Sequence, residues 1–416
     1  MYWQGIKQPF GFVLLVCVII LTQCSNHEAR TERPSTGAKE SYDTGEKVTV
    51  KHATHFTVKY FTNYKVVTTN GILSHYKGDE NQLQEDVMVL IPRGTEVPQL
   101  PQELSGAAII PIPPGRVALN IENIECFLRE LGLEQTIVAV GGLTSYNDSV
   151  RSKAKKGSIG QIGFSWHQPP NIEVLLERKA ELVFMNLTNL DFRSGLDKCR
   201  EMGIPTAPVF SWAEEDYLAR AEWIKFYAVF FDKEAEANRI FETIEHNCDS
   251  MKQLALKVAN KPTAIWGFYQ GGDTWAIHRH SIETQLMRDA GLNNVFEEPS
   301  LQFRNWGEPM STEELLKNGK SADHWIIGDI YSSALPSDRI MNSFNAWRTN
   351  QLYHTFKRSK PAENANDWLA TGTVHPDWIL ADLIMLTQPT LVGNREPYFM
   401  DVFKKNTSFP IMRDGN

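Results

Sequence analysis

Short apolar runs alternate with helix-like segments along most of this chain, and that alternation limits the fold more than any other feature. Runs typical of buried strands stand at 116–119, 136–140 and 182–185, with apolar residues at helical spacing between them. The same order returns with strand-like runs at 263–268 and 325–327. Strands that alternate with helices in this way form parallel sheets covered by helices. The sequence therefore predicts two α/β halves.

A similar helix start recurs in the two halves. Glu173 follows the capping residue Asn171, and Glu313 follows the capping residue Ser311 at the same spacing. An acid in the first helical turn interacts favourably with the helix dipole, by about 0.3–1 kcal/mol, and needs no other partner. Each glutamate alone is therefore explained as a helix-stabilising residue, and together they form a matched pair of carboxylates at two helix tips.

One segment has helical periodicity over an unusual length. Apolar residues recur at helical spacing from Ala237 to Ala255, which predicts a single helix that begins near Asp232. At about 1.5 Å per residue, this helix is about 36 Å long. That length is sufficient to bridge two lobes.

A β-rich stretch precedes the first half. Residues alternate in polarity at 56–61 and 64–69, and a strand-like run at 87–91 ends at Pro92. Asn70-Gly71 is a typical turn signal, so we expect hairpin strands on either side of it. The residues of this extension do not indicate its function.

The predicted fold class is α/β, with two parallel-sheet α/β lobes joined by a long rigid helix and preceded by a small β-rich extension. The expected segments, in chain order, are a lipoprotein signal peptide (1–23), a flexible linker (24–46), the β-rich extension (47–105), the N-terminal lobe (106–231), the interlobe helix (232–260) and the C-terminal lobe (261–416).

The first residues have the pattern of a secretory signal. Residues 10–21 are apolar and uncharged, and this run is shorter than the about 20 residues needed to span a bilayer. The run ends at Leu21-Thr22-Gln23-Cys24, which resembles the lipobox of bacterial lipoproteins, although Gln23 departs from the small residue usual there. The resemblance implies acylation of Cys24 and a lipid-anchored protein. The polar stretch 25–46 is typical of a flexible leash, and its lack of an acidic block favours the periplasm over the cell surface.

Composition excludes some functions. A net charge of −8 argues against nucleic acid as a partner. Cys126, Cys199 and Cys248 lie among apolar residues at helical spacing, so we expect small buried side chains and neither a disulfide framework nor a zinc site.

Several stretches resemble the substrate-binding lipoproteins of ABC importers that deliver iron chelates, haem or cobalamin. They run from about Gly115 to Pro389 and leave out the β-rich extension. The stretches are GRVALNIENIECFLRELGLEQTIVAVGG, PNIEVLLERKAELVFMN, LARAEWIKFYAVFFDKEAEANRIF, GGDTWAIHRHSIETQLMRDAGLNNVF, MSTEELLKNGKSADHWIIG and TGTVHPDWILADLI.

The resemblance implies a binding protein with its ligand between two lobes. In that family each lobe offers a glutamate to arginines on the membrane subunits of the importer, and Glu173 and Glu313 match those positions. Because an exposed ion pair contributes only about 0.2–1 kcal/mol, two such pairs orient docking more than they drive it. We expect a monomer without a cofactor, whose partners are the importer's membrane subunits, the ligand and, through the lipid anchor, a bacterial membrane.

Open α/β sheets bind ligands at the carboxyl ends of their strands, so loop-borne aromatic residues there are candidates for the cleft. Core packing is the alternative explanation for any one of them. Arg304 is a candidate contact for a carboxylate or an anionic chelate. His278, which with His280 alternates along a possible strand, is a weaker candidate for a direct metal contact. The candidate cleft residues are Tyr146, Phe164, Trp166, His167 and Trp212 in the first half, and Tyr269, Trp275, His278, Arg304, Trp306 and Tyr331 in the second.

Other classes of function have weaker support. A metalloenzyme would need a clustered Cys/His motif, and no such motif, Gly-rich phosphate loop, GxSxG or HExxH is present, so we expect no enzymatic activity. A partner-binding lipoprotein without a small-molecule ligand would give the β-rich extension a purpose. Among carriers, the resemblance favours an iron chelate (ferric siderophore or haem) over cobalamin, because such cargo is the commoner use of the family; the residues themselves do not decide between them.

Overall fold

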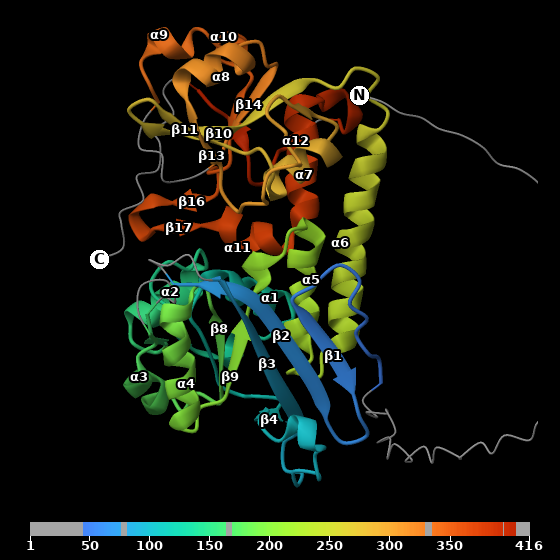
Figure 1. Ribbon diagram of the computed structural model, residues 1–416, viewed down its shortest axis with the longest axis vertical. Helices are drawn as coiled ribbons and strands as arrows, with labels where there is room; N and C mark the ends of the chain where they lie inside the picture. Colours follow the sequence, from blue (N-terminus) through green and yellow to red (C-terminus); the bar gives the residue numbers. More distant parts are fainter. Residues whose placement is uncertain (1–44, 76–80, 164–168, 329–334, 394, 405–416) are drawn as a thin grey trace, which may run out of the picture. The chain divides into compact units, whose positions relative to one another are not determined.

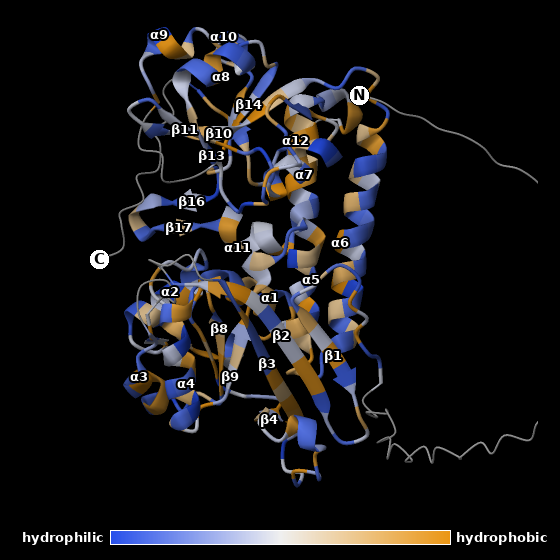
Figure 2. Cartoon of the chain, viewed as in Figure 1, coloured by the Kyte–Doolittle hydropathy of each residue, from blue (hydrophilic) through white to orange (hydrophobic). Residues whose placement is uncertain are grey.

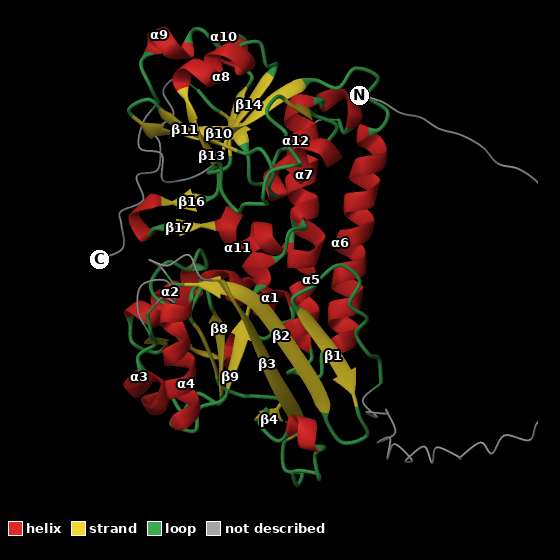
Figure 3. Ribbon diagram, viewed as in Figure 1, coloured by secondary structure: helices red, strands yellow, loops and turns green. Residues whose placement is uncertain are grey.

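A computed structural model describes residues 45–75, 81–163, 169–328, 335–393 and 395–404. Within the unit formed by residues 39–416, strands gather in the extension and in each of the two lobes, with helices around them (Figures 1 and 3). Hydrophobic residues concentrate on the lobe strands, as on β8 (Figure 2).

The N-terminal lobe has a sheet of parallel strands in the order β7-β6-β5-β8-β9. The chain enters at β5 in the middle, builds outward to β7 on one side, and then returns to β8 and β9 on the other. The crevice of such a sheet lies where the strand order reverses, which is beside β5. The elements are β5 (Val117–Leu119), α1 (Glu122–Glu130), β6 (Ile137–Val140), α2 (Asp148–Lys155), β7 (Gly160–Gln161), α3 (Ile172–Glu177), β8 (Leu182–Asn186), α4 (Arg193–Glu201) and β9 (Thr206–Val209).

The C-terminal lobe has a mixed sheet in the order β13-β11-β10-β14-β15-β18, with β12 beside β10. Strands β12, β10, β14 and β15 are parallel, whereas β11, β13 and β18 are antiparallel to their neighbours. The predicted α/β class is confirmed, and the parallel part forms the centre of this sheet. The elements are β10 (Thr263–Gly271), β11 (Thr274–Ile277), α7 (Ile282–Asp289), β12 (Asn293–Asn294), β13 (Glu308–Ser311), α8 (Thr312–Gly319), β14 (His324–Ile327), α9 (Asp338–Met341), α10 (Asn345–Arg348), β15 (Leu352–His354) and β18 (Asp401–Val402).

Three helices pack along one another at one side of the two lobes (Figure 1). Helix α6 (Glu234–Ala255) contacts both α5 (Tyr217–Ala228) and α12 (Pro376–Thr387) (Figure 1). Helix α5 follows the N-terminal lobe in the chain, and α12 lies between strands β15 and β18 of the C-terminal lobe. The long helix is therefore supported along its side by two others, which makes the connection stiffer than a single helix.

A short ribbon and a helix fill the space between the two sheets. Strands β16 (Ser359–Lys360) and β17 (Ala365–Asn366) form the ribbon, and α11 (Asp367–Val374) follows directly (Figure 1). Helix α11 packs against α1 of the N-terminal lobe. Residues 359–374 thus belong to the C-terminal half of the chain and contact the N-terminal lobe.

The β-rich extension is a four-stranded sheet in the order β1-β2-β3-β4. Strands β1 (Phe56–Tyr60), β2 (Lys65–Ser74) and β3 (Asn81–Pro92) pair antiparallel, and β4 (Ala108–Ile112) pairs parallel to β3. One face of the sheet packs into the same hydrophobic core as the N-terminal lobe. The extension is therefore an added layer of that core.

The turn predicted at Asn70-Gly71 is wrong, because both residues lie inside β2. The ring of Phe210, just after β9, packs against Gly71, and a Cβ atom there would overlap that ring. Glycine at this position permits a close approach between a strand and an aromatic side chain, and the sequence signal resembles that of a turn.

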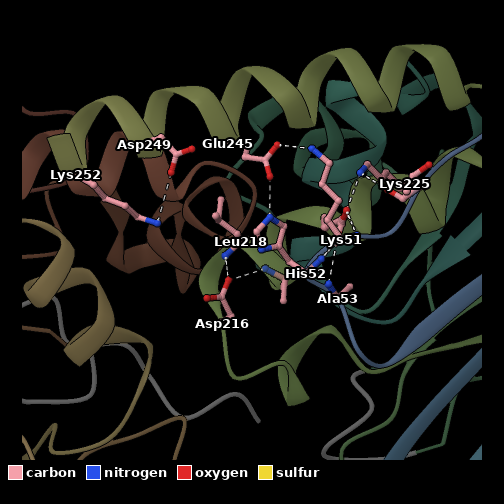
Figure 4. A network of polar contacts seen from close by, with 12 residues as sticks. Lys51, His52, Ala53, Asp216, Leu218, Lys225, Glu245, Asp249 and Lys252 are labelled. Carbon is pink, nitrogen blue, oxygen red and sulfur yellow. Dashed lines mark hydrogen bonds and ion pairs between the residues drawn. The ribbon is translucent and has the colours of Figure 1, made fainter.

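Residues 46–55, which we call the strap, connect the extension to α5 and α6 through hydrogen bonds and ion pairs. The buried carboxylate of Glu222 accepts hydrogen bonds from the backbone N–H groups of Lys51, His52 and Ala53 at 2.6–3.0 Å. Lys51 and His52 also reach Glu245 on α6, each at 2.8 Å (Figure 4). The strap thus joins the extension directly to the helix pair between the lobes.

Candidate functional site

A cavity of about 130 Å³ lies at the carboxyl ends of the central strands of the C-terminal lobe, and we call it the aromatic pocket. This volume is smaller than the about 300–1,000 Å³ typical of small-molecule sites, so the pocket fits one edge of a larger ligand. Trp306 is 62% exposed at its rim. The pocket is lined by the apolar residues Trp266, Phe268, Trp306, Trp368 and Leu369, by the polar residues His278, Glu283, Asn305, Thr355 and Asn366, and by Gly328.

A buried histidine and a half-buried carboxylate lie close together among the polar residues of the aromatic pocket. His278 Nδ1 lies 2.9 Å from Ser281 Oγ and 3.0 Å from Glu283 Oε2. Burial alone would raise the pKa of Glu283, but the charge and hydrogen bond of His278 outweigh it and lower that pKa to about 2. Glu283 is therefore a carboxylate at neutral pH.

The N-terminal lobe has a smaller cavity at the carboxyl ends of β5 and β6. Two glutamates from the first turns of α1, Glu122 and Glu125, lie beside Thr144 and Ser145 there. Burial raises the pKa of Glu125 to about 7, opposed by a hydrogen bond from Ser145 and the charge of Arg129. Burial also raises the pKa of Glu122. Both carboxyl groups at this cavity thus keep their protons to a higher pH than an exposed glutamate does.

Polar contacts join the two lobes beside these cavities. The guanidinium of Arg358 lies 5.0 Å from the ring centre of Tyr146, and Lys360 Nζ donates to the Tyr146 carbonyl at 2.8 Å. Arg358 Nε also donates to the buried carboxylate of Asp367 at 2.5 Å. Tyr146 therefore lies at the interlobe contact, bound to residues from the C-terminal half rather than lining the aromatic pocket.

The two glutamates proposed for docking are both exposed, each in the first turn of its helix. Asn171 Oδ1 accepts the Val174 N–H at 3.2 Å at the start of α3, and Ser311 Oγ accepts the Glu314 N–H at 3.2 Å at the start of α8. These caps fix the helix ends on which Glu173 and Glu313 lie. Glu173 also lines a shallow depression with Pro170, Ser194 and Lys198.

The prediction that Trp275 lines the ligand cleft is wrong. It is 0% exposed, packs against Trp325 with ring centres 5.2 Å apart, and donates its indole N–H to Thr312 Oγ1 at 3.0 Å. Strand β11 pairs with β10 and β13 on its two edges and turns this side chain into the core. Trp275 therefore stabilises the base of α8 and does not reach a ligand.

Three other candidates do not line the aromatic pocket. Tyr269 donates to the Gly272 carbonyl at 2.8 Å in the β10–β11 turn. Arg304 forms an ion pair with Glu308 at 2.7 Å. Trp212 is partly buried and donates to the Leu187 carbonyl at 2.8 Å.

The two histidines do not share a strand face, because β11 ends at Ile277. His278 lines the aromatic pocket, whereas His280 contacts the Leu301 carbonyl at 2.7 Å and packs edge-on against Phe303. Of the candidates, the structure places His278 and Trp306 together on the aromatic pocket. Phe164, Trp166, His167, Tyr331 and Cys24 lie outside the described residues.

Sequence reasoning missed most residues of the aromatic pocket, since only His278 and Trp306 were among the candidates. Trp266 reads as part of the buried run of β10, and Trp368 lies in α11, whose position is set by tertiary contacts. Glu283 has the pattern of an ordinary acid in a first helical turn. One feature of the sequence could have identified Glu283 as a pocket residue. It follows His278 by five residues, and this spacing allows the start of a helix to face the end of the preceding strand.

Residues 117–358 match the periplasmic binding protein family, and the chain belongs to that family. Two uncharacterized lipoproteins of Methanocaldococcus jannaschii are 25% and 23% identical, over 64% and 48% of this chain. The matches span 62% and 52% of the length of those relatives.

Two solved structures have a similar fold. A periplasmic haem-binding protein from Pseudomonas aeruginosa has a TM-score of 0.50 and 14% identity, covering 71% of this chain and 100% of that protein. Helicobacter pylori CeuE, solved as a Ni-His complex, has a TM-score of 0.50 and 13% identity, covering 78% and 90%. At these identities the likeness shows the fold alone.

Among residues 45–404, apart from the gaps, no helix has the length and apolarity to cross a membrane. In the same part of the chain, no group of at least three His, Cys, Asp or Glu side chains is placed to hold a metal ion.

Proposed function

We propose that this chain is the membrane-anchored substrate-binding component of an ABC importer, and that it captures an iron chelate in the interlobe cleft. The observation that carries the proposal is the aromatic pocket, because it lies at the carboxyl ends of the strands of a periplasmic binding protein fold. The signal-like start and Cys24 support a lipid anchor on the outer side of a bacterial membrane.

The type of ligand is supported by the chemistry of the pocket. Trp266, Trp306 and Trp368 offer aromatic faces, and Trp306 is exposed beyond the pocket rim. Aromatic rings stack on flat ligands and exclude water from them. A ligand larger than 130 Å³ would insert one edge and rest its remainder on the exposed rim. Ferric siderophores, haem and, as the alternative, cobalamin all have this size and partly apolar surface.

Delivery is supported by the exposure of Glu173 and Glu313 in the first turns of α3 and α8. Each lobe would present one carboxylate to arginines of the importer's membrane subunits. The stiff packing of α6 against α5 and α12 leaves little room for spontaneous closure, so release would depend on the importer separating the lobes. We expect the protein to act as a monomer.

The docking part is tested with the double substitution Glu173→Ala and Glu313→Ala. We expect loss of ligand uptake by cells and unchanged ligand affinity of the purified protein, because both side chains lie outside the aromatic pocket. The matched control is Glu177→Ala with Glu314→Ala, which removes one exposed glutamate from each of the same two helices. Equal loss of uptake in the control, or loss of ligand affinity in the docking variant, would contradict the assignment.

The cargo is tested by titrating the soluble chain from Ser25 onward with haem, ferric siderophores and cobalamin while recording tryptophan fluorescence and absorbance. Saturable quenching by one of them identifies the cargo, and Trp306→Phe should reduce the quenching because this ring is on the pocket rim. Trp325→Phe is the control, since that ring is buried in the core of the C-terminal lobe. If no ligand changes the fluorescence or the absorbance, the result contradicts the carrier function and favours a partner-binding lipoprotein.

A further inference from the structure

The aromatic pocket is formed by a base and two side walls. The base consists of β10 and the ends of β11 and β14 in the C-terminal lobe. The first side wall is the rim segment, residues 301–307, which carries Asn305 and Trp306. The second side wall is the start of α11, which carries Trp368 and Leu369. Both side walls lie outside the strands of the C-terminal sheet, so contacts with other elements must fix their positions.

The rim segment is held from both lobes. On the side of the C-terminal lobe, the Arg304 N–H donates to the His280 carbonyl at 3.0 Å. On the side of the N-terminal lobe, Asn305 Oδ1 accepts a hydrogen bond from Arg220 Nη2, and Asn305 Nδ2 donates to the Trp212 carbonyl at 3.1 Å. Asn305 therefore connects the aromatic pocket to α5 and to the loop that follows β9.

Arg220 is itself fixed by the loop that follows β9. Its Nε donates to the Glu214 carbonyl at 3.1 Å, and its Nη2 donates to the Trp212 carbonyl at 3.2 Å. The planar guanidinium thus reaches two carbonyls and Asn305 at once, a geometry that a lysine ammonium does not reproduce. Arg220 does not line the aromatic pocket. It therefore sets the position of Asn305, and with it that of the adjacent Trp306, without contacting a ligand.

The start of α11 is held in a similar way by a second arginine. Arg129, near the end of α1, donates from Nη2 to Oγ1 of the buried Thr371 at 2.9 Å. Thr371 follows Trp368 by three residues on α11, so the two side chains are neighbours on the helix. Trp368 in turn packs against Trp266 of the base, with ring centres 5.8 Å apart. Each side wall is thus bonded to one arginine from the N-terminal half of the chain.

We infer that Arg129 and Arg220 are positioning residues that hold the two side walls against the N-terminal lobe, so that the aromatic pocket is complete only while the lobes are in contact. This inference rests on the proposed function and concerns the release of the cargo. The base belongs to the C-terminal lobe, so separation of the lobes by the importer would break both arginine hydrogen bonds. The side walls would then lose their support, and the cargo would lose its contacts with Trp306 and Trp368.

The first measurement follows the rim segment in the absence of any ligand. Nitroxide labels are attached to the soluble chain from Ser25 onward through Lys155→Cys at the end of α2 and Gln302→Cys in the rim segment, both exposed positions. The chain's own cysteines in this part are buried and remain unlabelled. Double electron–electron resonance measures the distances between the labels. We expect a narrow distribution in the wild type and a broader one with an added longer component in Arg220→Lys.

The second measurement titrates the unlabelled variants with haem, ferric siderophores and cobalamin. We expect Arg220→Lys and Arg129→Lys each to weaken binding of the complex that the wild type binds by about tenfold, the effect of losing one hydrogen bond to a charged group. The loss should come mainly from faster dissociation, which stopped-flow fluorescence measures, because the side walls retain the cargo after it has entered.

The matched control is Arg116→Lys, because Arg116 also donates to backbone carbonyls, those of Arg178 and Lys179, but stays within the N-terminal lobe. It should keep the wild-type distances and affinity. Circular dichroism and Tm verify the fold of each variant, and Asn305→Ala serves in the distance measurement if Arg220→Lys does not fold. A wild-type distance distribution in Arg220→Lys, or wild-type affinity in both variants, would overturn the inference and leave the carrier function standing. Binding of none of the complexes by the wild type would overturn the carrier function and the release step together.

Discussion

Two glutamates, one in each lobe, have pKa values displaced in opposite directions, although one is buried and the other half-buried. Glu125 at the end of the N-terminal sheet has its pKa raised to about 7, and Glu283 in the aromatic pocket has its pKa lowered to about 2. Both carboxyls are removed from water, which by itself favours the neutral form. The difference lies in their neighbours, because Glu283 contacts the ring of His278 at 3.0 Å whereas Glu125 has the hydroxyl of Ser145 and a more remote Arg129.

The comparison shows what the two ends of the cleft can offer a ligand. The N-terminal end holds Glu125, whose pKa of about 7 lets its carboxyl keep a proton near neutral pH and donate a hydrogen bond. The C-terminal end presents a fixed imidazole with a carboxylate behind it. A ligand that spans the cleft would meet a hydrogen-bond donor on one side and a ring nitrogen on the other.

A third glutamate extends the comparison to a carboxylate that pairs with a lysine. Its substitution should have the largest effect on stability. Glu222 is 0% exposed, accepts the three backbone N–H groups of the strap, and pairs with Lys225 at 2.6 Å. Glu222→Ala leaves the Lys225 ammonium buried without its carboxylate partner, so we expect a loss of about 3–5 kcal/mol in the free energy of unfolding. Urea denaturation measures it.

Glu245→Ala is the matched control for the strap. Glu245 contacts Lys51 and His52 of the same segment, each at 2.8 Å, but it lies nearer to solvent. Its removal should cost only about 0.2–1 kcal/mol. Similar losses for the two variants would mean that the strap is held by contacts other than the buried carboxylate.

The fold was predictable because its signals are periodic and local. The strand-like runs around Val117, Leu182 and Thr263 and the helical stripe from Ala237 to Ala255 all form the elements that they indicate. Caps such as Asn171 and Ser311 act through hydrogen bonds within one helical turn, so they too are visible in the sequence.

The site was only partly predictable because its residues meet through tertiary packing. The sequence places loop residues at the carboxyl ends of strands, which led to His278 and Trp306. It does not show that residues 359–374 return between the lobes and bring Trp368 to Trp266, with ring centres 5.8 Å apart. The inward turn of Trp275 likewise depends on pairing of β11 with β13, which follows it by about thirty residues in the chain.

Glu125 provides the next test, through the pH dependence of stability. Its pKa is about 7 when folded and about 4.5 as the reference value, so between these values the native state binds more protons than the unfolded state. The stability must then fall as the pH rises through this window, by about 3 kcal/mol at 1.36 kcal/mol per unit. Glu125→Gln should remove that decline, because an amide has no proton to lose.

The measurement is urea unfolding of the wild type and Glu125→Gln at about pH 5 and about pH 8, with a smaller stability difference expected in the variant. Glu134→Gln is the control, since Glu134 contributes to the electrostatics of Glu125 but is bonded to Asn147 Nδ2 at 2.9 Å outside the small cavity. A variant that keeps the wild-type difference would show that Glu125 is ionised at neutral pH and that the two cleft ends are alike in charge.

Glu283 gives the opposite and smaller pH effect. Its pKa of about 2 lies below the reference of 4.5, so its contribution to stability is complete above about pH 4.5 and is lost as the pH falls toward about 2. Because the depressed pKa belongs to a pair with His278, the charge of that ring supplies part of the effect, and we expect about 1–2 kcal/mol from Glu283 itself. Acid unfolding of Glu283→Gln should lack this component, whereas Glu283→Gln combined with His278→Gln should resemble the single variant. If the single variant instead unfolds in acid like the wild type, the carboxylate is not bound to the ring, and the contrast between the two glutamates disappears.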